Sequence, residues 1–166
     1  MQRFPICELC ASTTTLCSGC NAKLAEGKIS ELDVCVSRIL LNSEDRFSVG
    51  KASFERCFDL GRMALILTSL EVSPLVGRGG RVAQMLSRQL GKHVRVVRSS
   101  SDARLMLEEI LLPIKPLGVN TVFSAKGSRF KVRIALKDAG RLPTDRESIG
   151  KVVRLLFGDS ATLVFE

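Results

Sequence analysis

The chain has 166 residues, 45% of them hydrophobic, and its 25 Lys and Arg outnumber its 17 Asp and Glu, which gives a formal net charge of +8. No apolar run reaches the ~18 residues of a membrane span, and the start runs into cysteines without a signal peptide, so we expect a cytoplasmic protein with no membrane partner. The positive balance favours a polyanionic partner, whereas the absence of Trp and Tyr argues against a protein that stacks bases on exposed rings.

Residues 1–29 carry two Cys-x-x-Cys knuckles separated by six residues. Two such knuckles can direct four thiolates at one centre and complete a closed tetrahedral site, which leaves no open position for catalysis. The segment is too short to bury a core, so a bound metal would supply its folding energy. We expect one structural Zn²⁺, with an iron–sulfur cluster, disulfides or a redox pair as alternatives. The expected ligands are Cys7, Cys10, Cys17 and Cys20.

Residues 30–100 predict the order helix, strand, strand, glycine turn, helix, strand. Ser30 and Asp33 match a capping box at the start of the first helix, and Gly91 ends the second. The expected strands cover residues 53–60, 63–70 and 94–98, and the second helix covers residues 81–90.

Several side chains receive purely structural interpretations. Cys35 lies on the apolar stripe of the first helix, so we expect it to be buried rather than to act as a fifth metal ligand. Cys57 alternates with acidic residues of its strand and is interpreted as a bystander away from the core. Phe58, Phe130 and Phe165 lie in apolar strand patterns and are expected in the core.

The glycine turn Val76-Gly77-Arg78-Gly79-Gly80 is the most informative pattern. Glycines at both ends let the backbone approach a bulky group, and the helix N-terminus behind it offers N–H groups and partial positive charge, which suits a phosphodiester. Residues 72–101 contain six Lys and Arg and no Asp or Glu, which favours nucleic acid over a small phosphate ligand. The candidate RNA contacts are Val76, Gly77, Arg78, Gly79, Gly80, Arg81, Arg88, Lys92 and Arg95.

Other phosphate-binding motifs fit this turn less well. A P-loop requires Gly-Lys-Ser/Thr at the helix start, and a dinucleotide fingerprint requires a third glycine where Val82 stands. What remains is the Gly-x-x-Gly turn of a KH module, which holds RNA backbone, or simple structural punctuation between a strand and a helix. A KH groove lines the bases with aliphatic residues, so it does not need aromatic rings.

Residues 101–166 repeat the order of the preceding segment. Helices are expected over residues 102–112 and 146–157, and strands over residues 119–124, 129–137 and 161–165. The glycine turn is replaced by Thr144-Asp145-Arg146-Glu147, in which Thr144 and Glu147 would form a capping box and the acids would occupy the phosphate position. One strand places Arg129, Lys131 and Arg133 on a positive face, which is either a second RNA-contacting surface or a solvated sheet face.

Taken together, these patterns resemble the archaeal NusA-like transcription factors over about residues 30–166. The resemblance rests on the paired α-β-β-α-β units, the glycine turn, the tail Leu90-Gly91-Lys92-His93-Val94-Arg95-Val96-Val97 and the linker helix ending Leu111-Leu112-Pro113. The Cys₄ module is similar to that of a zinc-bearing archaeal subgroup.

The resemblance implies an α+β fold with three parts: a zinc module over residues 1–29 and two tandem type II KH domains over residues 30–100 and 101–166. It also implies binding of single-stranded RNA in transcription elongation or termination, through Gly77, Arg78, Gly79 and Gly80. The second turn departs from the Gly-x-x-Gly pattern. The bacterial polymerase-binding amino-terminal domain and S1 domain have no counterpart, so contact with RNA polymerase is expected only by analogy.

We therefore expect a non-catalytic, RNA-binding transcription factor with no small-molecule substrate. A ribosome-associated or RNA-processing KH protein has the same sequence features, and a protein–protein adaptor could dock through the zinc module. An enzyme fits least well, because no paired carboxylates or nucleophile–base set stands out. The single histidine, His93, is interpreted as a surface or RNA-facing residue.

Overall fold

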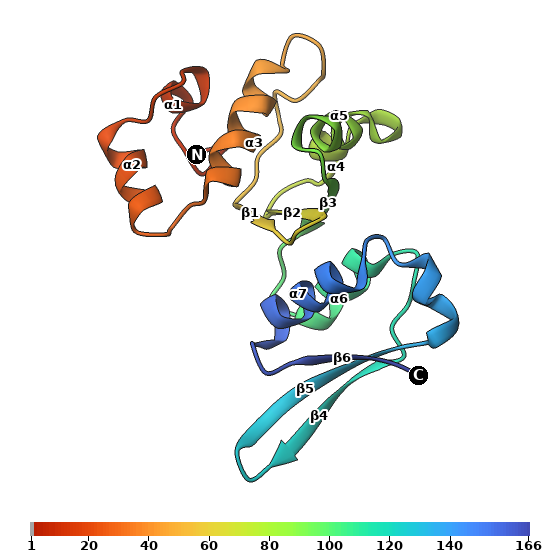
Figure 1. The fold of residues 1–166 in the computed structure, drawn as a ribbon. Helices are drawn as coiled ribbons and strands as arrows, with labels where there is room; N and C mark the ends of the chain where they lie inside the picture. Colours follow the sequence, from red (N-terminus) through yellow and green to blue (C-terminus); the bar gives the residue numbers. More distant parts are fainter. Residues whose placement is uncertain (1) are drawn as a thin grey trace. The chain divides into compact units, whose positions relative to one another are not determined.

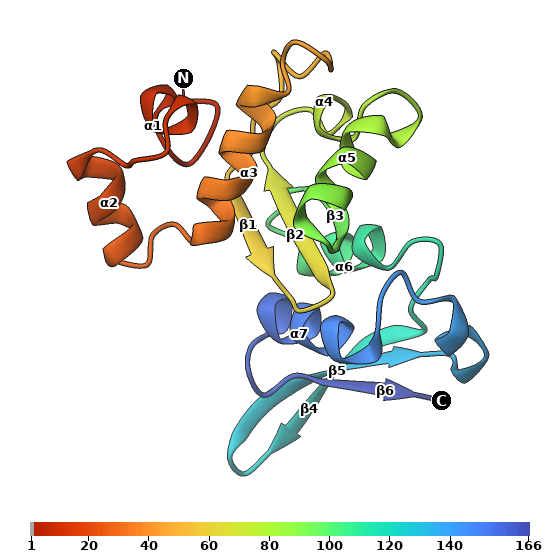
Figure 2. The same ribbon diagram turned by 45° about the horizontal axis from the view of Figure 1, so that its top comes forward.

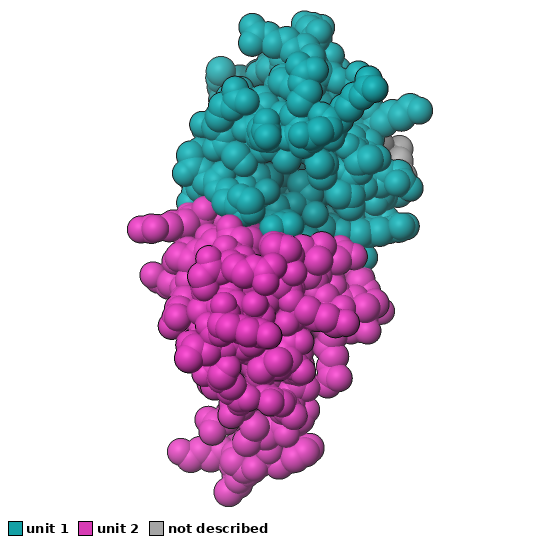
Figure 3. Space-filling model, turned by 90° about the vertical axis from the view of Figure 1, so that its right-hand side faces the viewer, with its two compact units in different colours: residues 1–59, 64–99 teal, residues 60–63, 100–166 magenta. Residues whose placement is uncertain are grey.

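A computed structural model describes residues 2–166 (Figure 1). The chain divides into two compact units, which have separate colours in Figure 3. Unit 1 contains residues up to Asp59 together with Ala64–Ser99, and unit 2 contains Leu60–Met63 together with Ser100–Glu166. The fold is α+β, with two three-stranded sheets. Within the described part of the chain, no helix is both long and apolar enough to cross a membrane.

Unit 1 begins with two short cysteine-bearing helices and continues with a helix–strand–strand–helix–strand order. Its sheet has the order β1-β2-β3, with β1 and β2 antiparallel. Figure 2 shows α3 beside β1 and α5 beside β3. The elements are α1 (Glu8–Ser12), α2 (Ser18–Ala25), α3 (Glu31–Asn42), β1 (Arg56–Asp59), β2 (Met63–Thr68), α4 (Ser73–Val76), the 3₁₀ helix η1 (Arg78–Gly80), α5 (Arg81–Leu90) and β3 (His93–Arg98).

One hydrophobic core runs through unit 1. Phe4 and Ile6, from the cysteine-bearing segment, are buried in the same cluster as Val36 and Leu40 of α3 and Leu86 of α5. The cysteine-bearing segment thus lies in the same compact unit as the first sheet. Its folding is supported by apolar burial as well as by whatever the cysteines bind.

The predicted capping box is present at the start of α3. Ser30 Oγ accepts the backbone N–H of Asp33 at 3.3 Å, and Asp33 Oδ2 accepts the backbone N–H of Ser30 at 2.8 Å. Asp33 is fully buried, and its second oxygen, Oδ1, accepts the backbone N–H of Cys57 in β1 at 2.5 Å. One carboxylate therefore caps the helix and fastens it to the sheet.

The interpretations of Cys35 and Cys57 are both wrong. The buried stripe of α3 runs through the polar residues Asp33 and Ser37, and at about 100° per residue Cys35 points roughly 200° away from Asp33, so Cys35 is exposed. Cys57 is buried because its strand turns this side of the sheet toward α3, where its backbone meets Asp33.

Unit 2 repeats the helix–strand–strand–helix–strand order without a glycine turn. Strands β4 and β5 form a long antiparallel hairpin, and β5 pairs with β6 in parallel. Helices α6 and α7 lie on one side of this sheet (Figures 1 and 2), and Val132, Ile149 and Val152 are fully buried between the layers. The elements are α6 (Ala103–Leu111), β4 (Gly118–Ser124), β5 (Gly127–Ile134), the 3₁₀ helix η2 (Leu136–Arg141), α7 (Arg146–Phe157) and β6 (Thr162–Phe165).

The phenylalanines are less buried than the strand patterns predict. Phe58, Phe130 and Phe165 are each only partly buried, and Phe130 packs against Phe157 with ring centroids 5.3 Å apart. Phe123, near the tip of the β4–β5 hairpin, is 82% exposed. Phe123 is therefore an exposed aromatic ring in a chain that has no Trp or Tyr.

Candidate metal centre and nucleic-acid interface

The four predicted cysteine ligands gather at one point. Their Sγ atoms all lie within 4.8 Å of one another. Cys7 and Cys17 directly precede α1 and α2, and Cys10 and Cys20 lie one turn further along each helix, so each knuckle is the start of a short helix. Cys10 and Cys20 are buried, whereas Cys17 is exposed.

The geometry of the cluster suits a single tetrahedral metal ion. Metal–sulfur bonds of about 2.3 Å in a tetrahedron separate the sulfurs by about 3.8 Å, and the Cys7–Cys10 and Cys7–Cys17 separations are 3.3 and 4.0 Å. Backbone N–H groups also donate to three of the sulfurs, as thiolates require: Cys17 N to Cys10 Sγ at 3.0 Å, and Cys20 N to Cys17 Sγ and Cys7 N to Cys20 Sγ, each at 3.4 Å.

These contacts shift the pKa values of Cys17 and Cys10 in opposite directions. The pKa of Cys17 falls to about 6, because the backbone N–H of Cys20 and the neighbouring thiols donate to its sulfur. The backbone N–H of Cys17 lowers the pKa of Cys10, but burial and the other thiols outweigh it and raise that pKa to about 12. Without a cation the cluster cannot readily hold four negative charges, and a divalent metal would supply the missing positive charge.

The glycine turn of unit 1 adopts a backbone conformation that needs glycine. Gly77, Gly79 and Gly80 all have positive φ, at 79°, 63° and 78°. At Gly77 there is also no room for a side chain, because an added Cβ would meet Val82. At Gly79 and Gly80 an added Cβ would point into open space. The turn therefore presents bare backbone at its exposed corner and packs its base against α5.

A groove of about 620 Å³ opens beside this turn. Its lining includes four cations and no carboxylate, and the Arg81 guanidinium lies over the Phe47 ring, 5.8 Å from its centroid. Part of the lining comes from the loop between α3 and β1. The lining residues are Arg46, Phe47, Ser48, Gly50, Lys51, Ser73, Pro74, Gly77, Arg78, Arg81 and Val82.

The sequence patterns did not reveal the part of the groove lining that Arg46, Phe47 and Lys51 form. A usable signal was present, because two cations flank an aromatic residue in a loop that was assigned to no element. What the sequence did not show is that this loop lies next to the glycine turn, more than 25 residues later in the chain.

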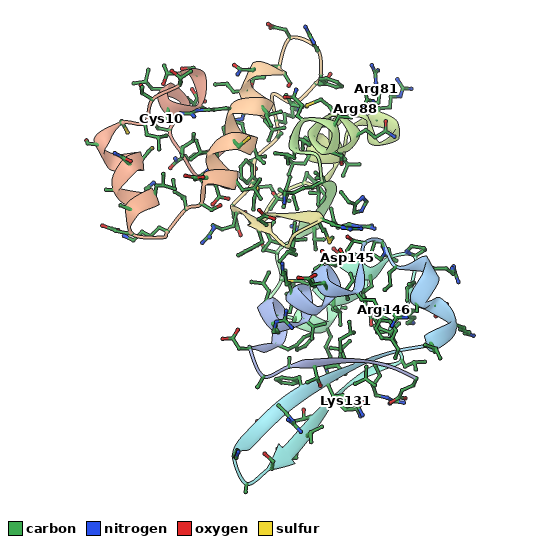
Figure 4. The ribbon with its side chains drawn as sticks, viewed as in Figure 1. Cys10, Arg81, Arg88, Lys131, Asp145 and Arg146 are labelled. Atoms are coloured by element: carbon green, nitrogen blue, oxygen red, sulfur yellow. The ribbon has the colours of Figure 1, made fainter. Side chains whose placement is uncertain are left out.

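The structure places the other predicted RNA contacts of unit 1 in three settings. Arg81 and Arg88 are exposed on α5 (Figure 4) and, seven residues apart, lie on the same face of the helix. Lys92 lies beyond the far end of α5, roughly 15 Å along the helix from the turn, and pairs with Asp59 at 2.7 Å. Arg95 lies in β3, where burial lowers the pKa of its guanidinium. Only Arg78 and Arg81 of these cations line the groove.

The predicted Thr144–Glu147 capping box is not formed. The residue that precedes α7 is Asp145, and its Oδ1 accepts the hydroxyls of Ser148 at 2.5 Å and Thr144 at 3.1 Å. Glu147 is exposed and pairs with Lys151 at 3.8 Å. The capping box fails because α7 begins at Arg146, so Thr144 is one residue too early to cap it. The expected negative charge at the start of α7 is nevertheless present (Figure 4).

The groove beside the start of α7 differs from that of unit 1. It measures about 460 Å³, and its lining includes the carboxylate of Glu147 beside Arg146 and Arg154. Arg146 stacks over Phe165 at 4.4 Å. Arg146 and Arg81 therefore hold equivalent positions, each as the first residue of its helix and each over an aromatic ring.

The predicted basic face of unit 2 contains an acid. Glu166 accepts two hydrogen bonds from the Arg133 guanidinium, at 2.9 and 3.0 Å, and lies 4.0 Å from Lys131 Nζ. The pair with Arg133 lowers the pKa of Glu166. Arg129, closer to the hairpin tip, is exposed. The positive charge of this face is therefore concentrated toward the tip.

Comparison with known proteins adds evidence on the fold alone. No protein-family model and no curated protein matches the chain. Solved structures do match, among them one titled "Crystal structure of APE1850", with a TM-score of 0.52 and 24% identity over 72% of this chain and 91% of that chain. This likeness shows that the arrangement of elements exists in a solved protein.

Proposed function

We propose that this chain is a non-catalytic protein that binds single-stranded RNA, and that its two α+β units are type II KH domains. The groove beside the glycine turn is the observation that carries the proposal. Four cations and no acid line it, and the turn that contributes Gly77 and Arg78 to the lining continues into the bare backbone of Gly79 and Gly80, which is the chemistry that a phosphodiester backbone requires.

The groove also offers surfaces for the bases. Pro74 and Val82 contribute apolar lining beside the turn, and Phe47 contributes a ring from the loop between α3 and β1. Phosphates would lie along Arg78 and the start of α5, where the helix N-terminus adds partial positive charge. In unit 2 the equivalent position carries Asp145 and Glu147, which would repel phosphate, so the two units have unequal roles.

Exchange of the glycine-turn residues tests the proposal directly. The variant Arg78→Asp, Gly79→Asp should lower affinity for a short fluorescein-labelled oligouridine by roughly tenfold or more in an anisotropy titration. The matched control is Arg104→Asp, Gly140→Asp, which makes the same charge change at an exposed arginine and at a glycine whose Cβ would meet nothing. Equal affinity of the two folded variants would refute binding through the turn.

We further propose that the cysteine cluster holds one structural Zn²⁺ through Cys7, Cys10, Cys17 and Cys20. Four sulfur donors at these separations, with backbone N–H groups on three of them, fit a closed zinc site. The ion would cross-link α1 to α2 and would neutralise the charge of the thiolates. Because four protein ligands complete the shell, no position is left for a substrate.

The part played in the cell is proposed from the resemblance to archaeal NusA-like factors, as a cytoplasmic role in transcription elongation or termination with contact to RNA polymerase. Sequencing of RNA cross-linked to the protein in vivo tests it. Enrichment of nascent transcripts supports this role, whereas enrichment of ribosomal RNA would favour the ribosome-associated alternative.

An adaptor function has one specific observation in its favour. A groove of about 820 Å³ in unit 1 is lined by the cysteine-bearing segment, α3, the following loop and α5, including Leu16, Ile39 and Met85. Such a groove could accept a protein segment. RNA affinity that does not depend on the glycine turn would favour this function.

A further inference from the structure

The tip of the β4–β5 hairpin carries an exposed aromatic residue that plays no part in the groove beside the glycine turn. Between Thr121 and Arg129 only Val122 is partly buried, and every other residue is exposed, so both faces of the hairpin tip are uncovered. Phe123 is the most exposed large apolar side chain described, at 82%. A phenylalanine this exposed contributes little of the hydrophobic stabilisation that it would contribute in the core.

The register defines what surrounds this ring. Phe123 lies directly opposite Ser128, and Val122 lies opposite Arg129. Phe123 thus shares its face with Thr121, Ser128 and Phe130, of which only Phe130 is covered, by Phe157. The ring is an isolated apolar spot among small polar side chains. A protein-docking patch needs several hundred Å² of continuous apolar surface, whereas one ring matches the face of one nucleobase.

The charge around the ring has a single sign. Residues 115–137 contain six Lys and Arg and no Asp or Glu; Lys126 is exposed in the turn, and Arg129 is exposed on the face opposite Phe123, across from Val122. The acid Glu166 pairs with Arg133 near the other end of β5. An aromatic face next to unopposed positive charge is the combination that sequence-tolerant single-strand binders use.

We propose that the β4–β5 hairpin tip is a second contact for single-stranded RNA, in which a base stacks on Phe123 and the adjoining phosphates lie against Lys126 in the turn, while Arg129 adds positive charge from the other face of the hairpin. This proposal rests on the proposed RNA-binding function and adds to it a site in unit 2 that does not depend on a glycine turn. The edge position of β4 in the sheet leaves the hairpin open to a passing strand.

Substitutions of Phe123 in the full chain test the stack. Phe123→Ala should weaken binding of the labelled oligouridine roughly 5- to 30-fold. Phe123→Leu should weaken it nearly as much, because leucine keeps apolar area but has no π-face, and Phe123→Tyr should bind like the wild type. The control Leu136→Ala removes another exposed apolar side chain of unit 2, 59% exposed, and should leave affinity unchanged.

Ultraviolet cross-linking to the same oligouridine, followed by peptide mapping, should place a uridine on Phe123. If Phe123→Ala binds as Leu136→Ala does, while Arg78→Asp, Gly79→Asp weakens binding, the hairpin proposal is overturned and the proposed function stands. If Phe123→Leu binds like the wild type, stacking is overturned. If the Phe123 variants lose affinity and the glycine-turn variant does not, the hairpin site stands and the turn is refuted. Failure of the wild-type chain to bind overturns both proposals.

Discussion

Gly77 lies so close to Val82 that a Cβ at position 77 would be 2.5 Å from Val82 Cγ2 and 2.8 Å from the Val82 backbone nitrogen. Gly79, two residues later, has the same positive sign of φ but open space around it. Both positions favour glycine because of their positive φ, but only position 77 also lacks room for a side chain.

This contrast predicts unequal effects of alanine. Gly77→Ala should lower the free energy of unfolding by about 3 kcal/mol, because both the backbone conformation and the packing against α5 resist it. Gly79→Ala should lower it by about 1 kcal/mol, the cost of a left-handed conformation alone. Urea unfolding followed by circular dichroism measures both. Equal losses would mean that α5 shifts to make room at position 77.

Asp33 should be the most sensitive polar residue of unit 1. Asp33→Ala removes the carboxylate half of the capping box of α3, leaves the Cys57 N–H without its acceptor, and leaves Arg56 Nε without the carboxylate 3.3 Å away. A loss of about 3 kcal/mol is expected in urea unfolding. Glu31→Ala, an exposed acid in the first turn of the same helix, serves as the control and should cost less than about 0.5 kcal/mol. A loss for Asp33→Ala as small as the control's would contradict this account.

Metal content should depend on the four clustered cysteines and not on Cys35 or Cys57. Purified protein should contain about one zinc per chain by elemental analysis, and Cys17→Ser, Cys20→Ser should contain none. The matched control, Cys35→Ser, changes an exposed cysteine of the same unit and should keep the metal. Chelation should lower the unfolding temperature of the wild type but not of the double variant. Unchanged zinc in the double variant would rule the site out.

The salt dependence of RNA binding should show whether Arg46 and Lys51, which line the groove, contact phosphates. Each phosphate neutralised on a single strand contributes about 0.7 to the slope of log affinity against log salt. Arg46→Ser, Lys51→Ser should therefore reduce the slope by about 1.4 if both cations face phosphates. Anisotropy titrations over a range of potassium chloride concentrations give the slope. A wild-type slope near zero would contradict a basic groove altogether.

Unit 2 should lose stability in acid partly through Asp145. The hydroxyl of Ser148 lowers the pKa of Asp145 below its ordinary value of 3.8. A depressed pKa stabilises the folded state above the ordinary value, and this contribution is lost as the pH falls through the folded pKa. Ser148→Ala should flatten the decline in stability below about pH 4, seen in urea titrations at successive pH values. An unchanged decline would show that other carboxylates control it.

The features that sequence predicted correctly are those whose causes lie within a few residues. The Ser30–Asp33 box and the helix from Arg81 to Gly91 depend on local spacing, and the structure shows both. The four cysteines are recognisable because each pair has the Cys-x-x-Cys spacing of metal ligands. The structure brings their Sγ atoms close together.

What the sequence could not give depends on contacts between distant segments. The burial of Cys57 depends on Asp33, 24 residues earlier, and the phase of α3 depends on that same buried carboxylate. Phe47 and Gly77 line one groove although 29 residues separate them. Phe123 is exposed because the β4–β5 hairpin is long and carries this residue past the helices that pack on the sheet. The alternation of residues along a strand does not show how far a hairpin extends.

The shared core of unit 1 has a thermodynamic consequence. Because the cysteine cluster and the glycine turn belong to one compact unit, which we expect to unfold as a whole, any ligand that binds only its folded state draws the unfolding equilibrium toward that state. At the proposed sites, RNA bound at the turn should then raise the affinity of the cluster for metal, and metal in the cluster should raise the affinity for RNA by the same factor, since linkage is reciprocal. If the cluster binds zinc and the turn binds RNA as proposed, the supply of zinc would influence how tightly the protein binds RNA.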